Sequence, residues 1–322
     1  MADSQGLAIG LSALLGLLVG SFLNVVIARL PRMMQRQWLQ DACAALESNA
    51  GDAHSPQPSH LWQSVLGSSS AWSPSLAASI ATLQQALDKL PHLGLARPRS
   101  HCPVCKHTIA WYDNIPLVSF LLLRGRCRHC TSPISLRYPA VEVVTAALFA
   151  LCAQRWGLSL LALAWAAYAA ILICQFLIDF DTQLLPDTLN YSLMWLGLLV
   201  AAGGQNISLQ QSVVGAACGY LILWSFYHLY RLVTGKEGMG YGDFKLLAAL
   251  GAWLGVDYLL ALILLSSGVG AALGIALLIV KRIAHKDVPI AFGPFLAGAG
   301  LLCLVIGPMQ VQQLMPWAFV LR

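Results

Sequence analysis

The chain has 322 residues, of which 58% are hydrophobic and only 10% are charged, against about 25% charged in an average soluble domain. With a mean hydropathy of +0.68, it has too few charged groups to cover the surface of a soluble globule, so a soluble protein is excluded. The net charge of +5 matters mainly through where the basic residues lie.

Eight apolar segments are long enough to cross, or nearly cross, a bilayer, which takes about 20 residues per helix. They span residues 7–28, 139–154, 160–178, 189–202, 213–233, 243–254, 259–280 and 290–306. Several are shorter than about 17 residues, the usual lower limit, so seven crossings is the alternative. The predicted fold is an all-α polytopic membrane protein with about eight transmembrane helices.

The distribution of basic residues predicts the orientation. With the N-terminus outside, only Arg155 and Arg322 of the 19 Lys and Arg residues lie on the outer side, and cytoplasmic loops are the ones enriched in basic residues. The first apolar segment has no basic stretch before it and ends at Arg29-Leu30-Pro31-Arg32. We therefore expect a retained membrane anchor at residues 1–31 and no cleavable signal peptide.

A mostly polar insert, residues 32–138, separates this anchor from the membrane domain predicted at residues 139–322. It contains two CxxC pairs, Cys102 with Cys105 and Cys127 with Cys130. Four thiolates on two knuckle-like turns suit tetrahedral Zn²⁺, and disulfides would not persist on the reducing side of the membrane. We predict a small cytoplasmic zinc-ribbon-like module; redox-active or simply paired cysteines are the alternative.

The insert also contains a long segment, residues 37–96, that is rich in Ala, Ser, Gln and Pro. We expect loose order between residues 49 and 70. A helix is predicted after Ser73-Pro74, because apolar residues then recur at helical spacing up to Leu90. It is expected to pack on the cysteine module or on the membrane surface.

Two aspartates lie where acidic residues are rare. Asp179 closes the apolar run 160–178, and Asp243 follows a segment in which Gly238, Gly240 and Gly242 surround Tyr241. A carboxylate within a bilayer costs about 2.5–3.5 kcal/mol near the centre, so such groups are usually functional. Two neighbouring carboxylates can share a proton and act as general acid and general base, as in an aspartyl protease.

Asp243 is expected in the first turn of the next helix, where backbone N–H groups and the helix dipole favour a carboxylate. The alternative is that it only caps that helix. Among the other acids, Asp181 is expected in a turn and Asp187 at the cap of a helix beginning at residue 188 or 189. Glu142, near the start of the second apolar segment, either orients a basic group of the substrate or pairs with a nearby arginine such as Arg137.

Taken together, the motifs resemble those of the type IV prepilin peptidases over nearly the whole chain. The matching elements are Gly20-Ser21-Phe22-Leu23-Asn24 with Arg29-Leu30-Pro31, the four cysteines, residues 114–119, Arg137-Tyr138-Pro139 leading to Glu142, Leu185-Pro186-Asp187, the GxGDxK element at residues 240–245, and Phe292-Gly293-Pro294-Phe295. The departures are Ala28, Ala291 and an unusually long stretch before the first cysteine pair.

This resemblance implies a bacterial inner-membrane enzyme whose catalytic pair, Asp179 and Asp243, lies at the cytoplasmic face. Such enzymes cut the basic leader from type IV prepilins and type II secretion pseudopilins after a glycine, then N-methylate the new terminus with S-adenosylmethionine. The family associates methylation with the insert, where Gly125 and Arg126 match a Gly-basic pair. The expected partners are these substrates and the lipid bilayer, with no nucleic acid; the sequence does not define the oligomeric state.

Two other functions fit part of the pattern. A membrane thiol–disulfide oxidoreductase would use the two cysteine pairs, but it would need them on the oxidising side. A transporter could use Asp179 and Asp243 to carry protons or cations. It would explain neither the GYGD turn nor the four cysteines.

Overall fold

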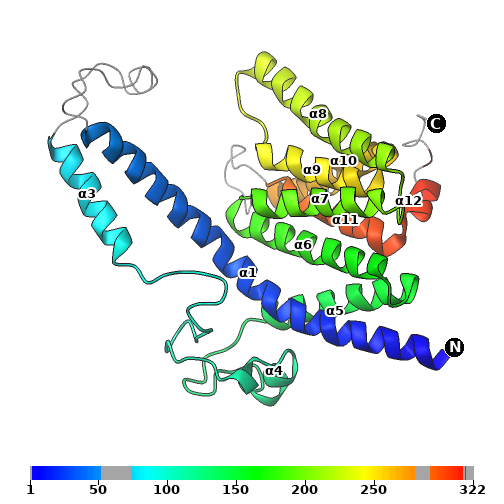
Figure 1. The fold of residues 1–322 in the computed structure, drawn as a ribbon, viewed down its shortest axis with the longest axis horizontal. Helices are drawn as coiled ribbons and strands as arrows, with labels where there is room; N and C mark the ends of the chain where they lie inside the picture. Colours follow the sequence, from blue (N-terminus) through cyan, green and yellow to red (C-terminus); the bar gives the residue numbers. More distant parts are fainter. Residues whose placement is uncertain (1, 52–73, 280–290, 315, 317–322) are drawn as a thin grey trace. The chain divides into compact units, whose positions relative to one another are not determined.

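The computed structural model describes residues 2–51, 74–279, 291–314 and 316 (Figure 1). Most of the stretch expected to be loosely ordered, residues 49–70, lies outside this range. Within it, the regular elements are helices, and β-pairing is limited to two isolated bridges. The predicted all-α class is therefore confirmed for the described part of the chain.

The chain divides into two compact units, Met1–Ile27 with His101–Arg322, and Ala28–Ser100. The helix α1 (Ala2–Gly51) contributes to both and continues through Pro31. The helices of the larger unit are α4 (Val118–Leu122), α5 (Arg137–Trp156), α6 (Leu160–Thr182), α7 (Asp187–Ala202), α8 (Leu209–Thr234), α9 (Tyr241–Leu254), α10 (Leu259–Ile279), α11 (Gly293–Ile306) and α12 (Pro308–Leu314), with 3₁₀ turns η2 (Trp111–Asn114) and η3 (Val256–Tyr258).

Four segments are long and apolar enough to cross a membrane: Gln5–Leu46, Leu160–Thr182, Leu209–Thr234 and Val256–Ala276. The other four predicted crossings also form helices, α5, α7, α9 and α11. Of these, α7 has 16 residues and α9 and α11 have 14 each, fewer than the roughly 17 that a span usually needs. Four crossings are thus supported directly, and the total of eight stays a prediction.

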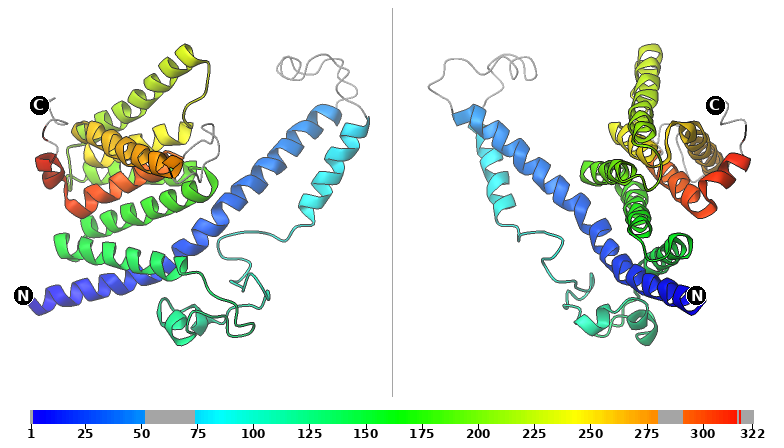
Figure 2. Two further views of the ribbon diagram at one scale, coloured as in Figure 1. Left: turned by 180° about the vertical axis from the view of Figure 1, so that it is seen from behind. Right: turned by 45° about the vertical axis from the view of Figure 1, so that its right-hand side comes forward.

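The short helix α9 is the centre of the larger unit. It packs against α7, α8, α10 and α11, and from Asp243 to Leu254 every residue except Lys245 is buried. Seen from behind, α10 crosses over this region (Figure 2, left). Its neighbours therefore cover α9 over most of its length.

Glycines bring helix backbones into direct contact at two places. A Cβ atom on Gly215 of α8 would collide with the carbonyl oxygen of Gly251 of α9, and the reverse also holds. In α1, a Cβ on Gly20 would come within 2.7 Å of the Cα of Glu142 in α5. Small residues at helix contacts are typical of membrane bundles, and here they set how closely α9 and α1 approach their neighbours.

The smaller unit consists of the second half of α1 and the helix α3 (Pro74–Asp88). This confirms the helix predicted after Ser73-Pro74. Its Ile80 and Leu87 are buried with Cys43 of α1, and Arg36 of α1 donates hydrogen bonds to the carbonyls of Leu87, Leu90 and Pro91. The partner that the structure shows for α3 is thus the extension of α1, which the sequence did not predict; packing of α3 on the cysteine module or the membrane surface stays a prediction. The physical reason is that α1 continues beyond Pro31 and offers an apolar face to α3.

Candidate active site and cysteine module

The structure brings together the two aspartates identified in the sequence. Asp179 lies in the last turn of α6 and Asp243 in the first turn of α9, which confirms that a helix begins just before Asp243. Both are buried, with 4% and 7% of their surface exposed, and their carboxylates are close enough for an electrostatic interaction. Two buried carboxylates in this relation can divide acid and base roles between them.

Each carboxylate accepts a hydrogen bond from the backbone N–H of a glycine. Gly293 donates to Asp179, and Gly240 donates to Asp243. Gly240 caps α9 and Gly293 is the first residue of α11, so each aspartate lies at the positive end of a helix dipole. The sequence predicted this environment for Asp243 only.

Leu185, in the connection between α6 and α7, packs between the two glycine-containing turns. A Cβ atom on Gly242 would come within 2.7 Å of the Cβ of Leu185, and one on Gly293 within 2.9 Å of its Cδ1. The glycines at these positions therefore allow α9 and α11 to approach both Leu185 and Asp179. Larger residues would push the starts of these helices away from the aspartates.

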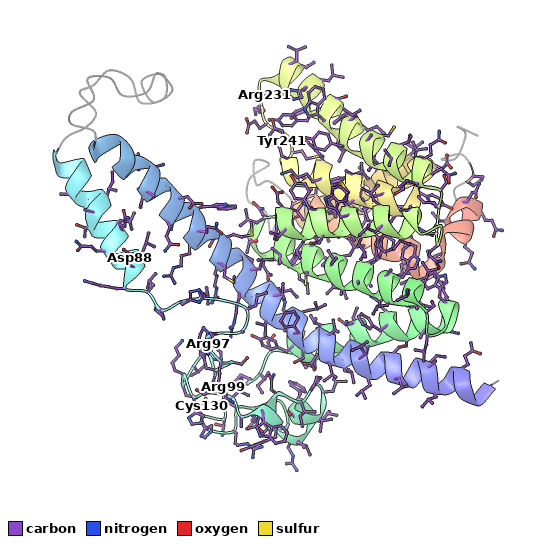
Figure 3. All side chains as sticks on the ribbon, in the orientation of Figure 1. Asp88, Arg97, Arg99, Cys130, Arg231 and Tyr241 are labelled. Carbon is purple, nitrogen blue, oxygen red and sulfur yellow. The ribbon has the colours of Figure 1, made fainter. Side chains whose placement is uncertain are left out.

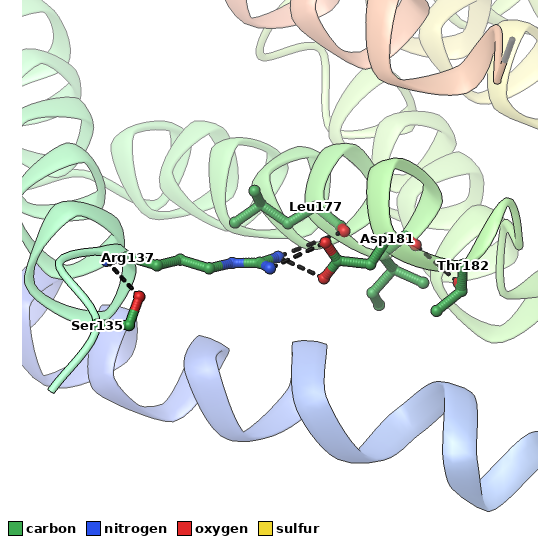
Figure 4. A network of polar contacts seen from close by, with 6 residues as sticks. Ser135, Arg137, Leu177, Asp181 and Thr182 are labelled. Atoms are coloured by element: carbon green, nitrogen blue, oxygen red, sulfur yellow. Dashed lines mark hydrogen bonds and ion pairs between the residues drawn. The ribbon is translucent and has the colours of Figure 1, made fainter. Parts of the chain in front are cut away.

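Two ion pairs lie near the end of α6 and the start of α9, the helices that carry Asp179 and Asp243. Arg137, at the start of α5, pairs with Asp181 at 2.6 Å and also donates to the carbonyl of Leu177 (Figure 4). Asp181 belongs to the last turn of α6 and not to the following turn, which corrects the prediction. The helix runs on to Thr182 and ends at its C-cap, Gln183, whose left-handed conformation stops it there.

The second ion pair joins Lys245 of α9 to Asp187 at 2.6 Å. Asp187 is the first residue of α7, and Pro186 occupies the cap position. The helix therefore begins one or two residues earlier than predicted, since the fixed φ of proline suits a helix start. The side chains of Asp181 and Asp187 are about one third and one half exposed, unlike the two buried aspartates.

Glu142 is buried in α5, where its Oε2 accepts a hydrogen bond of 2.9 Å from the backbone N–H of Leu117. Ser21 of α1 also donates to it. Arg137, the partner considered from the sequence, binds Asp181 instead. Glu142 thus connects α1, α5 and the segment that leads into α4.

The four cysteines of the two CxxC pairs form one cluster. Their sulfur atoms all lie within 4.8 Å of one another, and those of Cys102 and Cys130 are 3.8 Å apart. Tetrahedral zinc with bonds of about 2.3 Å requires its sulfur ligands to be roughly 3.8 Å apart, so the donor set fits zinc. The backbone N–H groups of Cys105 and Val104 lower the pKa of the Cys102 thiol to about 6, which favours the thiolate needed to bind a metal.

The two pairs are built alike. In each, the N–H of the first cysteine donates to the carbonyl five residues later, and the N–H four residues later donates back to that cysteine: Cys102 with His107 and Lys106, Cys127 with Ser132 and Thr131. Lys106 and Thr131 both have positive φ values, 59° and 57°. Two equivalent turns point their sulfurs at one centre, as the spacing predicted; Figure 3 labels Cys130 in this module.

Gly125 and Arg126 lead into the second cysteine turn. Gly125 has a φ of 67° and its N–H donates to the carbonyl of Phe120, so it closes the turn after α4. Arg126 is exposed beside it. Arg128 pairs with Asp113 at 2.5 Å and lowers the pKa of that carboxyl, which ties the second cysteine turn to η2.

Comparison with known proteins places the chain in a family. Residues 166–275 match the type IV leader peptidase family, and residues 14–156 match the bacterial peptidase A24 N-terminal domain. The prepilin leader peptidase/N-methyltransferase of Stutzerimonas stutzeri is 46% identical over 310 residues, which cover 94% of this chain and 93% of that protein. The chain belongs to the type IV leader peptidase family.

Other members of the type IV leader peptidase family are similarly close. The prepilin leader peptidase/N-methyltransferases of Aeromonas hydrophila and Pseudomonas aeruginosa are each 44% identical, over 91% and 95% of this chain and 89% and 92% of their own lengths. No solved structure matches the chain significantly. The two matched regions include Asp179, Asp243 and all four cysteines of the module.

Sequence reasoning missed three contributors to the site. Gly293 donates to Asp179, and the buried amides of Gln175 and Asn190 lie next to the two aspartate-bearing turns. Gly293-Pro294 did carry a usable signal, because proline at the first position marks a helix start. For Gln175 and Asn190 the signal was an amide inside an apolar run, but their partner could not be read locally.

Proposed function

We propose that this chain cleaves the basic leader peptide of type IV prepilins and type II secretion pseudopilins, and then N-methylates the new N-terminus. Family membership supports both activities, and the relatives' names state them. The observation that carries the peptidase assignment is the meeting of two buried aspartates, Asp179 and Asp243, each held by a helix-start N–H.

In this proposal the two carboxylates share one proton between them. The ionised aspartate accepts a proton from a water molecule, whose oxygen attacks the scissile carbonyl carbon. The protonated aspartate then donates its proton to the peptide nitrogen as the C–N bond breaks. Burial of both groups excludes bulk water and strengthens these electrostatic interactions.

The chain would lie in the bacterial inner membrane with eight crossings formed by α1 and α5–α11, a periplasmic N-terminus and the aspartates at the cytoplasmic face. The basic residues support this orientation. The proposed division is an anchor at residues 1–31, a cytoplasmic insert at 32–138 and the peptidase domain at 139–322. A basic leader would then reach Asp179 and Asp243 from the cytoplasm.

The cysteine module would hold a structural zinc ion through Cys102, Cys105, Cys127 and Cys130. The sulfur separations and the paired turns support this ligand set. The closed set of four thiolates is typical of a structural site, since catalytic zinc keeps a ligand position open. Zinc would then stabilise the fold of the insert.

Methylation would use S-adenosylmethionine at the insert, with Gly125 and Arg126 as the proposed contacts. The exposed guanidinium of Arg126 offers a donor pair that suits the carboxylate of the methionine moiety. Gly125 sets the turn that presents it. Bound S-adenosylmethionine would supply the methyl group for the new amine.

The test is cleavage of a purified prepilin by the protein in detergent, with labelled S-adenosylmethionine. Wild type, Asp179→Asn and Asp243→Asn are compared, and Asp181→Asn is the matched control. We expect wild type and the control to cut the prepilin and label the product, and both other variants to be inactive while still folded.

Cleavage by either Asp179→Asn or Asp243→Asn would contradict the dyad, because an amide can serve neither as general acid nor as general base. Cleavage without label would leave a peptidase and remove the methylation proposal. If wild type does not cut, the transporter function becomes the better explanation of the buried aspartates.

A further inference from the structure

Gln175 of α6 and Asn190 of α7 form a polar pair that is sealed from solvent. Both residues are fully buried, at 0% exposure. Nε2 of Gln175 donates to Oδ1 of Asn190 at 2.7 Å, and Nδ2 of Asn190 donates to the carbonyl of Gly242 at 3.4 Å. The two amides therefore connect α6, α7 and the start of α9.

The donor and acceptor groups involved fix the direction of these two hydrogen bonds. The carbonyl of Gly242 can only accept, so the amide nitrogen of Asn190 must face it. The oxygen of Asn190 then faces Gln175, which must donate through its own nitrogen. The orientation of both amides therefore follows from the carbonyl of Gly242, and it does not depend on telling amide oxygen from nitrogen.

Both ends of this series of hydrogen bonds lie beside an aspartate. Gln175 is one helical turn before Asp179, on the same face of α6, and Gly242 directly precedes Asp243 in α9. Leu185 packs on Gly242 from another side. Leu185 and Asn190 thus contact Gly242 from two sides, and the polar contact leads back to the helix of Asp179.

Burying two amides is unfavourable unless they are hydrogen-bonded, and an apolar pair of similar size would fill the same space without that requirement. A hydrogen-bonded pair differs from an apolar pair in that its directional bonds fix the positions of the groups that it joins. A shift of about 1 Å in a reacting group can lower a rate about 100-fold, and the two carboxylates come from separate helices.

We propose that Gln175 and Asn190 are positioning residues that hold the first turn of α9, and with it Asp243, in register with Asp179. The proposal rests on the peptidase function proposed above. Neither amide takes part in the chemistry; the pair acts through the backbone of Gly242.

The test compares Gln175→Met, Asn190→Leu and the double variant with wild type. Each single variant leaves a buried amide without its partner, so both stability and kcat should fall. The double variant removes both amides and leaves an apolar pair. We expect its melting temperature to recover to near the wild-type value, while kcat stays about 10- to 100-fold lower and KM changes less than twofold.

Ser212→Ala is the matched control. Ser212 is also fully buried, and its hydroxyl donates to the carbonyl of Ala252 at 2.6 Å. It therefore holds the opposite end of the same helix α9. This control should lower the melting temperature and leave kcat unchanged.

Hydrogen exchange of the backbone amides of residues 241–246 gives a second readout that needs no activity. We expect faster exchange there in the double variant and no change in Ser212→Ala. A double variant with wild-type kcat, or with unchanged exchange in this turn, would overturn the positioning role and leave the pair as packing. If wild type does not cut prepilin, the peptidase function fails separately, and the exchange measurement still decides whether the pair holds this turn.

Discussion

Gly293 leaves no room for a side chain next to Asp179. A Cβ atom at this position would collide with Oδ2 of Asp179, the carboxylate that accepts the backbone N–H of Gly293. The close approach and the hydrogen bond thus depend on the same missing Cβ. The contact between Gly293 and Asp179 connects the start of α11 to the end of α6.

Gly293→Ala should therefore damage the proposed active site without unfolding the protein. The added methyl group must displace either the carboxylate of Asp179 or the start of α11, and a shift of about 1 Å lowers a rate by roughly 100-fold. We expect a fall of that size in prepilin cleavage, measured with purified protein in detergent.

The control for this variant is Gly298→Ala in the same helix. A Cβ at Gly298 would meet only the ring of Phe176, at 3.6 Å, an ordinary contact. Cleavage by Gly298→Ala should stay near the wild-type rate. A Gly293→Ala protein that cuts as fast as this control would remove the proposed role of the close approach.

The contact between Gly215 and Gly251 predicts where α9 tolerates no added atoms. Gly251→Ala would force α8 and α9 apart and should destabilise the protein by about 1–3 kcal/mol, the usual range for overpacking. Gly268→Ala in α10 is the control, because a Cβ there meets nothing within 4 Å. Thermal unfolding in detergent measures both, and equal melting temperatures would contradict the packing shown here.

The ion pair between Arg137 and Asp181 should matter little for stability and not at all for the chemistry. Its side chains are 38% and 35% exposed, and such pairs contribute about 0.2–1 kcal/mol. A double-mutant cycle with Arg137→Gln and Asp181→Asn should give a coupling energy in this range. Loss of cleavage in Asp181→Asn would instead move the catalytic assignment away from Asp179.

The cysteine module should bind about one zinc ion per chain, as four thiolates around one centre do. Cys102→Ser should lower the zinc content measured by atomic absorption, and it should reduce methylation more than cleavage. Cys303→Ser is the control, because Cys303 is a fully buried residue of α11 outside the module. Full zinc content in Cys102→Ser would exclude this ligand set.

Much of the site could be predicted from residues that are close together in the chain. The GYGD segment predicted a helix start at Asp243, and the two CxxC spacings predicted two equivalent turns; both are present. The predicted helix ends were wrong by one or two residues. The last turn of α6 includes Asp181, and α7 begins at Asp187, because helix ends depend on caps that fluctuate by a residue or two in any sequence rule.

The partners of those residues could not be predicted in the same way. Gly293 reaches Asp179, and Asn190 reaches Gly242, across helices that are far apart in the chain. Hydrophobic periodicity reports which face of a helix is buried, but it does not report which neighbour covers that face. The buried position of α9 was hidden for the same reason, since a central helix and a lipid-facing one are both apolar (Figure 1).

The sequence by itself determined that this is a helical membrane protein with two rare acidic groups and a four-cysteine cluster. Those features follow from composition, apolar segment length and local spacing, which act within a few turns of the chain. Only the tertiary structure decided that α11 donates to Asp179, that Gln175 and Asn190 connect the two aspartate-bearing helices, and that α3 packs on α1. These contacts arise from helix packing, where shape and polar satisfaction between distant segments select one arrangement among many that the local pattern allows.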